Sequence, residues 1–186
     1  MKNKLKLMMS ATVLISALAL PDVVLASDGT VTFNGALVAS TCTVVVNGGG
    51  SANGTVTLPT VATSLLATTG DTAGVTQFTL NLAGCGLITN LTTVNAFFES
   101  GAGVDPTTGN LINLTGGGAA NVVVQLFPAN DLTTQIKPGL YPQVKATDIL
   151  LADGSGTLNY AAQYYALDTT TAGAFSSNVT YSLIYN

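Results

Sequence analysis

The sequence predicts an all-β domain of the sandwich or barrel class, and three features lead to this prediction. Short segments rich in Val, Thr, Tyr and Phe recur along the chain, and several alternate apolar and polar residues with the period of a strand. Clusters of Gly, Asn, Asp and Pro separate these segments, as turns do. No long amphipathic helix is visible. Many short strands joined by glycine-rich turns are typical of sandwiches and barrels.

The chain begins with the features of a secretory signal peptide. Three lysines in the first six residues precede an apolar run over 7–20, and a small-residue pattern at 24–26 suits cleavage before Ser27. The apolar run is shorter than the roughly 20 residues that a spanning helix needs, although a retained anchor is the alternative. We therefore expect residues 1–26 to be removed and the mature chain to be exported without membrane insertion.

The expected elements of the mature chain follow from these patterns. In chain order, strands are expected at 30–38, 43–46, 76–82, 93–98, 121–127, 157–167 and 178–185, and one short helical turn at 61–66. Glycine-rich turns bound them, such as those at 48–50, 116–118 and 153–156. The stretch 101–118 is expected to be a long loop, to which the sequence assigns no role. No repeat or linker divides the chain, so one domain is expected.

The two ends of the mature chain carry alternating apolar patterns. Most domains leave their ends unpaired, so strand patterns placed there predict edge strands. The alternating positions are Val31, Phe33, Gly35 and Leu37 at the N-terminal end and Val179, Tyr181, Leu183 and Tyr185 at the C-terminal end. Asn34-Gly35 can alternatively form a type I′ hairpin turn.

Cys42 and Cys85 are the only cysteines of the chain. In an exported chain a disulfide is the default, and it would close a loop of 43 residues. By the chain-entropy relation, such a loop contributes on the order of 4 kcal/mol. Two buried free thiols are the alternative. The chain has no Cys-x-x-Cys motif, so a structural role is favoured over a redox role.

The residue inventory excludes several classes of function. The mature chain has 160 residues, and its two lysines and eight acids give a net charge of −6. A chain with so few basic side chains is not expected to bind nucleic acid or an anionic membrane. Histidine, the commonest general base and metal ligand, is absent, and Glu99 is the only glutamate. We therefore expect no enzymatic activity, no cofactor and no metal.

Five motifs together resemble a known family. Gly29-Thr-Val-Thr-Phe-Asn-Gly35 precedes Cys42 with a Gly-to-Cys spacing of seven residues, and Asn81-Leu-x-x-Cys85 follows. Thr171-Ala-Gly173 and a penultimate tyrosine close the pattern, after Tyr160-x-Ala-Gln-Tyr-Tyr-Ala166. Over residues 27–186 the chain resembles the type 1-like fimbrial subunits, the pilins of the chaperone–usher class.

This resemblance implies an incomplete immunoglobulin-like sandwich that lacks its last strand. Residues 27–39 would be an N-terminal donor-strand extension, and 40–186 the pilin domain. A periplasmic chaperone would fill the groove left by the missing strand until the extension of the next subunit replaces it at the outer-membrane usher. Such strand addition, of which pilins are an established example, uses main-chain hydrogen bonds for pairing and alternate side chains to fill pockets. The product would be a fimbrium on the cell surface.

The resemblance also implies roles for single residues. The donor-strand residues would be Val31, Phe33, Gly35 and Leu37, with the glycine where a side chain would collide with the acceptor. The groove and chaperone-binding residues would be Gly173, Tyr181, Leu183, Tyr185 and Asn186. For Gly173 a need for backbone freedom is expected. In the alternative interpretation, residues 31–37 are an ordinary first strand and the tyrosines are ordinary core residues.

The function expected from the resemblance is that of a structural subunit, the major shaft subunit of a fimbria that supports adhesion. The alternatives are a minor fimbrial adaptor and a carbohydrate-binding adhesin module. The length leaves room for only one domain, and the chain has no Trp, the best sugar-stacking side chain. Both observations count against the adhesin.

Overall fold

The computed structural model describes residues 31–35, 42–85, 93–143, 149–150 and 154–185. The chain divides into two units, Met1–Leu37 and Val38–Asn186, and each is considered by itself. In the first unit, the described residues 31–35 form neither helix nor strand. The strand expected at 30–38 is therefore not present over this part of the range. A single extended segment makes no ladder without a partner.

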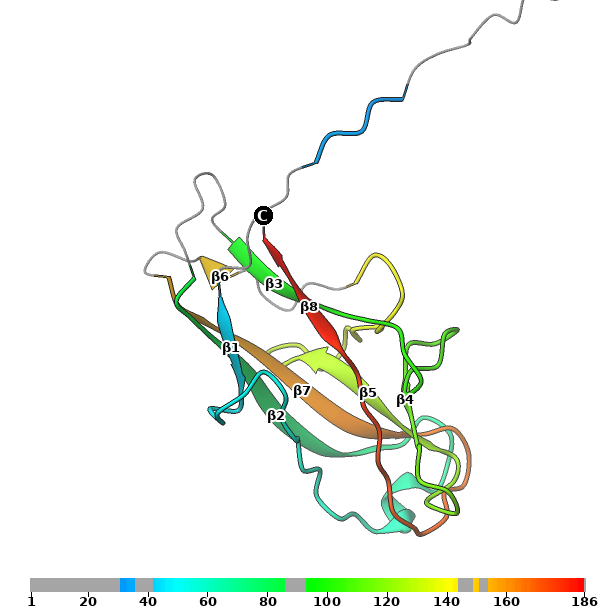
Figure 1. The fold of residues 1–186 in the computed structure, drawn as a ribbon. Coiled ribbons are helices and arrows are strands. Elements are labelled where there is room, and N and C mark those ends of the chain that lie inside the picture. Colours follow the sequence, from blue (N-terminus) through cyan, green and yellow to red (C-terminus); the bar gives the residue numbers. More distant parts are fainter. Residues whose placement is uncertain (1–30, 36–41, 86–92, 144–148, 151–153, 186) are drawn as a thin grey trace, which may run out of the picture. The chain divides into compact units, whose positions relative to one another are not determined.

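The second unit is all-β, as predicted. Its elements are β1 (Thr43–Val46), the short 3-10 helix η1 (Thr63–Leu66), β2 (Thr72–Ala83), β3 (Thr93–Phe98), β4 (Leu111–Ile112), β5 (Val122–Pro128), β6 (Ile149–Leu150), β7 (Gly156–Ala166) and β8 (Tyr181–Tyr185). They form a five-stranded sheet in the order β1-β2-β7-β5-β4 and a three-stranded sheet in the order β6-β3-β8 (Figure 1). Every strand pair is antiparallel.

The expected strands of this unit are present, and β1 and β3 have the predicted bounds. β8 begins at Tyr181 rather than at 178, because the backbone before it bonds to loops instead of a strand. The C=O of Ser176, for example, accepts from Leu114 N–H at 2.7 Å. The stretch 101–118, expected to be a loop, contains the two-residue strand β4 and buries Val104 in the core.

The core lies between the facing sheets and is rich in aromatic contacts. Tyr160 on β7 stacks on Phe78 of β2, with ring centroids 5.4 Å apart, and meets Phe98 of β3 edge-on at 5.1 Å. Burial of aromatic area in such offset and edge-on pairs stabilises a core beyond the area term alone. The other large contributors to this cluster are Leu80, Leu82, Val94, Val124, Leu126, Ile136 and Leu158.

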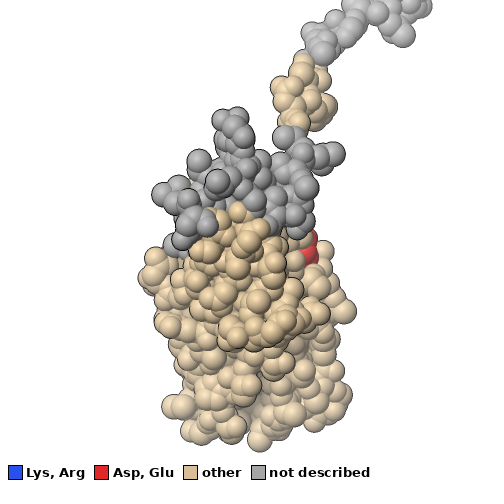
Figure 2. Space-filling model, turned by 60° about the vertical axis from the view of Figure 1, so that its left-hand side comes forward, with Lys and Arg blue, Asp and Glu red and all other residues tan. Residues whose placement is uncertain are grey.

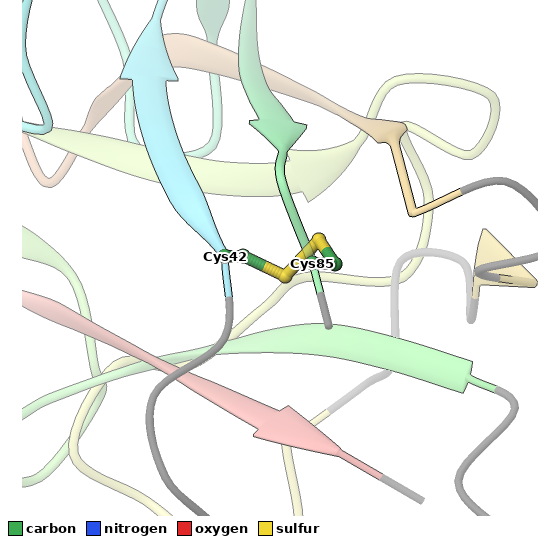
Figure 3. The surroundings of a disulfide bond; sticks show 2 residues. All are labelled: Cys42 and Cys85. Carbon is green, nitrogen blue, oxygen red and sulfur yellow. A yellow bond between two sulfur atoms is a disulfide. The ribbon is translucent and has the colours of Figure 1, made fainter. Parts of the chain in front are cut away.

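The predicted disulfide is confirmed. Cys42 and Cys85 are joined by an S–S bond of 2.07 Å, and their Cα atoms are 4.0 Å apart (Figure 3). Cys42 immediately precedes β1 and Cys85 lies just beyond β2, and these two strands are ladder partners. The bond therefore fixes one end of the outer strand β1 to its neighbour. Among the residues that the structure describes, no helix is long and apolar enough to cross a membrane.

Candidate functional site

The outer edge of β8 is open. β8 ends the three-stranded sheet and pairs with β3. Glu99 N–H donates to the C=O of Thr180 at 2.8 Å. Because paired and unpaired residues alternate along an antiparallel ladder, the even-numbered residues of β8 bond to β3 and the odd-numbered ones face away. The backbone groups that face the open edge belong to Tyr181, Leu183 and Tyr185, and no described strand meets them.

The side chains along this edge lie on the rim of the core. From 175 to 185 every odd-numbered residue is half-buried and every even-numbered residue is exposed. The apolar members of this series, which we call the rim row, are Phe175, Val179, Tyr181, Leu183 and Tyr185, and all five pack against the core. A row of large apolar side chains that stays half-buried is covered on one side only, so it offers apolar surface to a further strand.

β1 is the outer strand of the five-stranded sheet, and its far edge is also open. Asn47 N–H donates to the C=O of Thr79 in β2 at 2.9 Å, so by the same alternation Val44 and Val46 turn their backbone groups outward. The loop after β1 satisfies Val46, whose N–H donates to Ser51 C=O at 3.1 Å. No described residue satisfies Val44 in this way.

Apolar side chains of β1 and of the segment after it are half-buried as well. Val44 of β1, and Val56 and Leu58 downstream of it, are half-buried and pack against the same core as the rim row; we call these three the second row. The sequence analysis did not single them out, although the alternation Val56-x-Leu58 was a usable signal. The two sheets thus share one core, and each ends at an open strand, β1 in one sheet and β8 in the other.

One hydrogen bond connects the two edges. The hydroxyl of Tyr181 donates to the C=O of Ala52, in the loop after β1, at 2.8 Å. Burial raises the pKa of Tyr181 above its ordinary value, so the hydroxyl keeps its proton at neutral pH.

Charge plays little part at this site. The rows contain no Asp, Glu, Lys or Arg, and the Glu99 carboxylate accepts a 2.7 Å hydrogen bond from Ser182 on the exposed side of β8. Figure 2 shows a face that is almost free of charge, with acidic atoms at one spot and no basic atoms. No cluster of metal-ligating side chains occurs among the described residues. The arrangement can pair with a strand through backbone groups and apolar contacts.

The predicted donor-strand residues are partly described. Val31 and Phe33 are 77% and 90% exposed. Gly35 has no other heavy atom within 4 Å of the position of a Cβ, and its φ is not positive. The alternative type I′ turn at Asn34-Gly35 needs positive φ at both residues and is therefore not formed. Leu37 lies outside the described residues.

The predicted groove residues are not all brought together. Tyr181, Leu183 and Tyr185 lie side by side on the open edge of β8, and Asn186 lies outside the described residues. Gly173 lies in the connection between β7 and β8. A Cβ there would come within 2.4 Å of Ala119 N, and its φ is not positive. Close packing, rather than the expected backbone freedom, explains glycine at this position.

Similar proteins point to one family. The family model described as type-1 fimbrial protein, A, matches residues 58–186. The F17 fimbrial protein of Escherichia coli is 42% identical over 174 residues, which cover 92% of this chain and 94% of that protein. The major fimbrial subunit SMF-1 of Stenotrophomonas maltophilia is 41% identical over 165 residues, which cover 87% of this chain and 94% of that protein.

Solved structures agree with the fold. A chaperone–usher pilus subunit aligns with a TM-score of 0.58 at 22% identity, over 86% of this chain and 96% of that one. The P pilus rod subunit PapA aligns with a TM-score of 0.58 at 19% identity, over 78% of this chain and 99% of that one. The fold is therefore that of the chaperone–usher pilins, an incomplete immunoglobulin-like sandwich. The chain belongs to the type-1 fimbrial protein family and is a structural subunit of a surface fimbria, not an enzyme.

Proposed function

We propose that this subunit polymerises by donor-strand exchange to build the fimbrial shaft. The observation that carries the proposal is that β1 and β8 are both open on one side while their half-buried apolar side chains share a core. An open, apolar strand edge is an aggregation hazard unless another strand pairs with it.

The occupant is the N-terminal extension of a second copy. Residues 31–35 belong to no described strand, and they expose large apolar side chains at alternate positions, Val31 and Phe33. A strand with this alternation can turn one apolar face towards the two rows while its backbone pairs with β8. Donor and acceptor surfaces differ, so the contact is heterologous and extends into a fibre.

The route to the surface is part of the same proposal. The signal peptide over 1–26 directs the chain to the periplasm, where a chaperone covers the open edges until the extension of the next subunit replaces it at an outer-membrane usher. The donor residues Val31, Phe33, Gly35 and Leu37, and the acceptor residues Gly173, Tyr181, Leu183, Tyr185 and Asn186, keep their proposed roles. No observation favours the adaptor or the adhesin.

Periplasmic extracts of cells that produce the subunit with its chaperone and usher test this function. Unboiled samples are analysed for a ladder of subunit multimers that resists SDS. The wild type is expected to give a ladder, and deletion of residues 27–37 is expected to remove it while the chaperone still binds the subunit. A soluble monomer that needs no chaperone would mean that the sandwich is complete and would overturn the proposal.

A further inference from the structure

The chain contains three Asn-Gly pairs, and the structure holds them to different degrees. They are Asn34-Gly35, Asn47-Gly48 and Asn53-Gly54. Asparagine is a chemically labile residue, and it loses its side-chain ammonia most readily before glycine, which leaves the next backbone nitrogen unhindered. Whether a given pair reacts depends on whether the side-chain amide carbon and that nitrogen can meet.

The pair Asn47-Gly48 is fixed at both reacting groups. The side-chain oxygen of Asn47 accepts from Thr79 N–H at 2.8 Å, and Asn47 N–H donates to Thr79 C=O at 2.9 Å. Gly48 N–H, the group that would have to attack, donates to the side chain of Asn81 at 3.2 Å. Ring closure would break these hydrogen bonds, so the folded subunit is expected to protect this pair.

The pair Asn53-Gly54 is held by its backbone on both sides. The preceding carbonyl, that of Ala52, accepts from the Tyr181 hydroxyl at 2.8 Å. A Cβ on Gly54 would lie 2.5 Å from Val46 Cβ, so the glycine backbone packs directly on β1. Asn53 itself is exposed. This pair is therefore an intermediate case, in which the backbone is held and the asparagine side chain faces solvent.

The pair Asn34-Gly35 is held at neither reacting group. Residues 31–35 are exposed and belong to no helix or strand. Within the described part of the chain, no hydrogen bond reaches Asn34 or Gly35. Apart from the glycine and its chain neighbours, no heavy atom lies within 4 Å of the position of a Gly35 Cβ. The backbone nitrogen can therefore turn onto the side-chain amide carbon.

We propose that Asn34-Gly35 is a deamidation site whose reaction removes unassembled subunits from polymerisation. The Gly35 nitrogen bonds to the side-chain carbonyl carbon of Asn34 and gives up its proton. The bond from that carbon to the amide nitrogen breaks, and ammonia leaves with the proton. Water then opens the succinimide ring at either carbonyl, where its oxygen joins the carbon and a proton goes to the ring nitrogen. The product is aspartate or isoaspartate, and no electrons are gained or lost.

Isoaspartate is the product that disables the extension. It adds a methylene group to the main chain between Phe33 and Gly35, so the backbone groups on its two sides no longer match the spacing of a ladder, and the alternate side chains no longer share one face. Aspartate leaves the main chain intact, and its carboxylate lies on the strand face opposite Phe33 and Gly35. This inference rests on the proposed polymerisation.

Pairing with a neighbouring subunit would protect the same site. In a ladder the backbone around Asn34 is held extended by hydrogen bonds, and the ring cannot close until they open. Deamidation is therefore expected in subunits that wait for a partner, and it is expected to be much slower in subunits within the fibre.

Purified chaperone-bound subunits that are aged in buffer test the site itself. Proteolysis and mass spectrometry locate the deamidated residues, and isoaspartyl methyltransferase labels isoaspartate. Asn34 is expected to react at least tenfold faster than Asn47, with Asn53 between them, and faster still at mildly alkaline pH, where the Gly35 nitrogen loses its proton more readily. In SDS-resistant multimers the reaction at Asn34 is expected to be at least tenfold slower. Equal rates at Asn34 and Asn47, or in multimers and complexes, would overturn the inference.

The consequence for assembly is measured on the same aged complexes. Each variant is compared with its own fresh sample for the yield of SDS-resistant multimers, which corrects for effects of the substitution itself. The wild type is expected to lose yield in proportion to its isoaspartate at position 34. Asn34→Gln is expected to keep its yield, because the longer side chain closes a ring far more slowly. Asn53→Gln is the matched control and is expected to lose yield as the wild type does.

A further variant separates the charge from the change in the main chain. Fresh Asn34→Asp is expected to polymerise within about threefold of the fresh wild type, as a substitution on an exposed strand face does. A tenfold loss in this variant would show that the carboxylate, and not the added methylene group, blocks pairing, and would overturn the assignment to isoaspartate.

Failure of this inference can be told from failure of the proposed function. If the wild-type ladder needs residues 27–37 but aged chains rich in isoaspartate polymerise as fresh ones do, the site does not control assembly and polymerisation stands. If the ladder forms without residues 27–37, donor-strand exchange itself is wrong, whatever happens at Asn34.

Discussion

At the scale of single residues, aspartates in this chain serve to close turns. The Asp131 carboxylate accepts from the Thr133 hydroxyl at 2.6 Å and from the Thr133 and Thr134 N–H groups at 2.9 and 3.2 Å. These hydrogen bonds, that of the Thr133 side chain first, lower the pKa of Asp131 to about 2. Asp71 and Asp105 accept from threonines in the same way, and their pKa values are lowered too. These three carboxylates are thus committed to local turns, and the two rows contain no charged side chain.

Among the described residues, one buried side-chain polar atom lacks a hydrogen-bond partner. Tyr160 is 1% exposed, and its hydroxyl makes no hydrogen bond of acceptable geometry among the described residues. Burial raises the pKa of Tyr160 to about 12, a rise that the nearby Ala96 backbone offsets only in part. An unsatisfied buried hydroxyl costs about 1–3 kcal/mol.

Tyr160→Phe is therefore expected to stabilise the subunit at neutral pH. Since the folded-state pKa of Tyr160 lies above the ordinary value of 10.0, the contribution of its neutral hydroxyl to the stability of the wild type is complete below pH 10 and is lost as the pH rises through about 12. The phenylalanine variant has no such group at this position and is expected to lose less. Urea unfolding of both proteins between neutral pH and about pH 12 checks this. A variant that unfolds more easily than the wild type at neutral pH would contradict the assignment.

At the scale of elements, close contacts between connections decide where glycine is required. The connection from β7 to β8 passes the connection from β4 to β5, where Ala119 N–H donates to Ala174 C=O at 2.9 Å. The side chain of Asn113 donates to the same carbonyl at 2.9 Å. Gly173 lies at this crossing, so the crossing positions the chain segment that leads into the rim row.

Gly173→Ala is expected to destabilise the subunit by about 1–3 kcal/mol, as overpacking at a rigid contact does. The Cβ would lie 2.4 Å from Ala119 N and 2.6 Å from Gly118 C, which are backbone atoms that cannot turn aside. Gly101→Ala is the matched control, because it has no heavy atom within 4 Å of the new Cβ and no positive φ. Thermal unfolding of the chaperone-bound subunits measures both. Equal melting temperatures for the two variants would show that the crossing can move.

The elements also show which parts of the fold could be predicted. β1 and β3 have the predicted bounds because β-branched and aromatic runs end there at turn residues. β4 and β6 have two residues each, too few for a period to be visible. Val56 and Leu58 of the second row alternate in the sequence, but this signal spans only two residues outside any strand, and the tertiary structure is what places their segment on the core. The Tyr181–Ala52 bond joins residues 129 positions apart, beyond any local pattern.

At the scale of the whole molecule, sparse charge fits a subunit that assembles. Charged residues make up 8% of the chain, and Lys137 is the only basic side chain in the part that the structure describes. A free protein with this composition gains little solubility from its surface. In an isolated subunit, the open edges leave backbone groups unpaired and apolar side chains only half-buried. Pairing with the strand of a neighbouring subunit would satisfy the backbone groups and cover the apolar side chains. The sparse charge and the open strand edges therefore both indicate a subunit that assembles with other subunits.

Assembly through these edges is expected to be insensitive to salt. The rim and second rows contain no Asp, Glu, Lys or Arg, so pairing rests on backbone hydrogen bonds and apolar burial. Between about 0.1 and 1 M NaCl the Debye length falls from about 10 to about 3 Å, which would weaken an interface held by charges. The yield of SDS-resistant multimers formed by purified chaperone-bound subunits is expected to change less than twofold over this range. A tenfold loss would instead place charged residues outside the two rows in the contact between subunits.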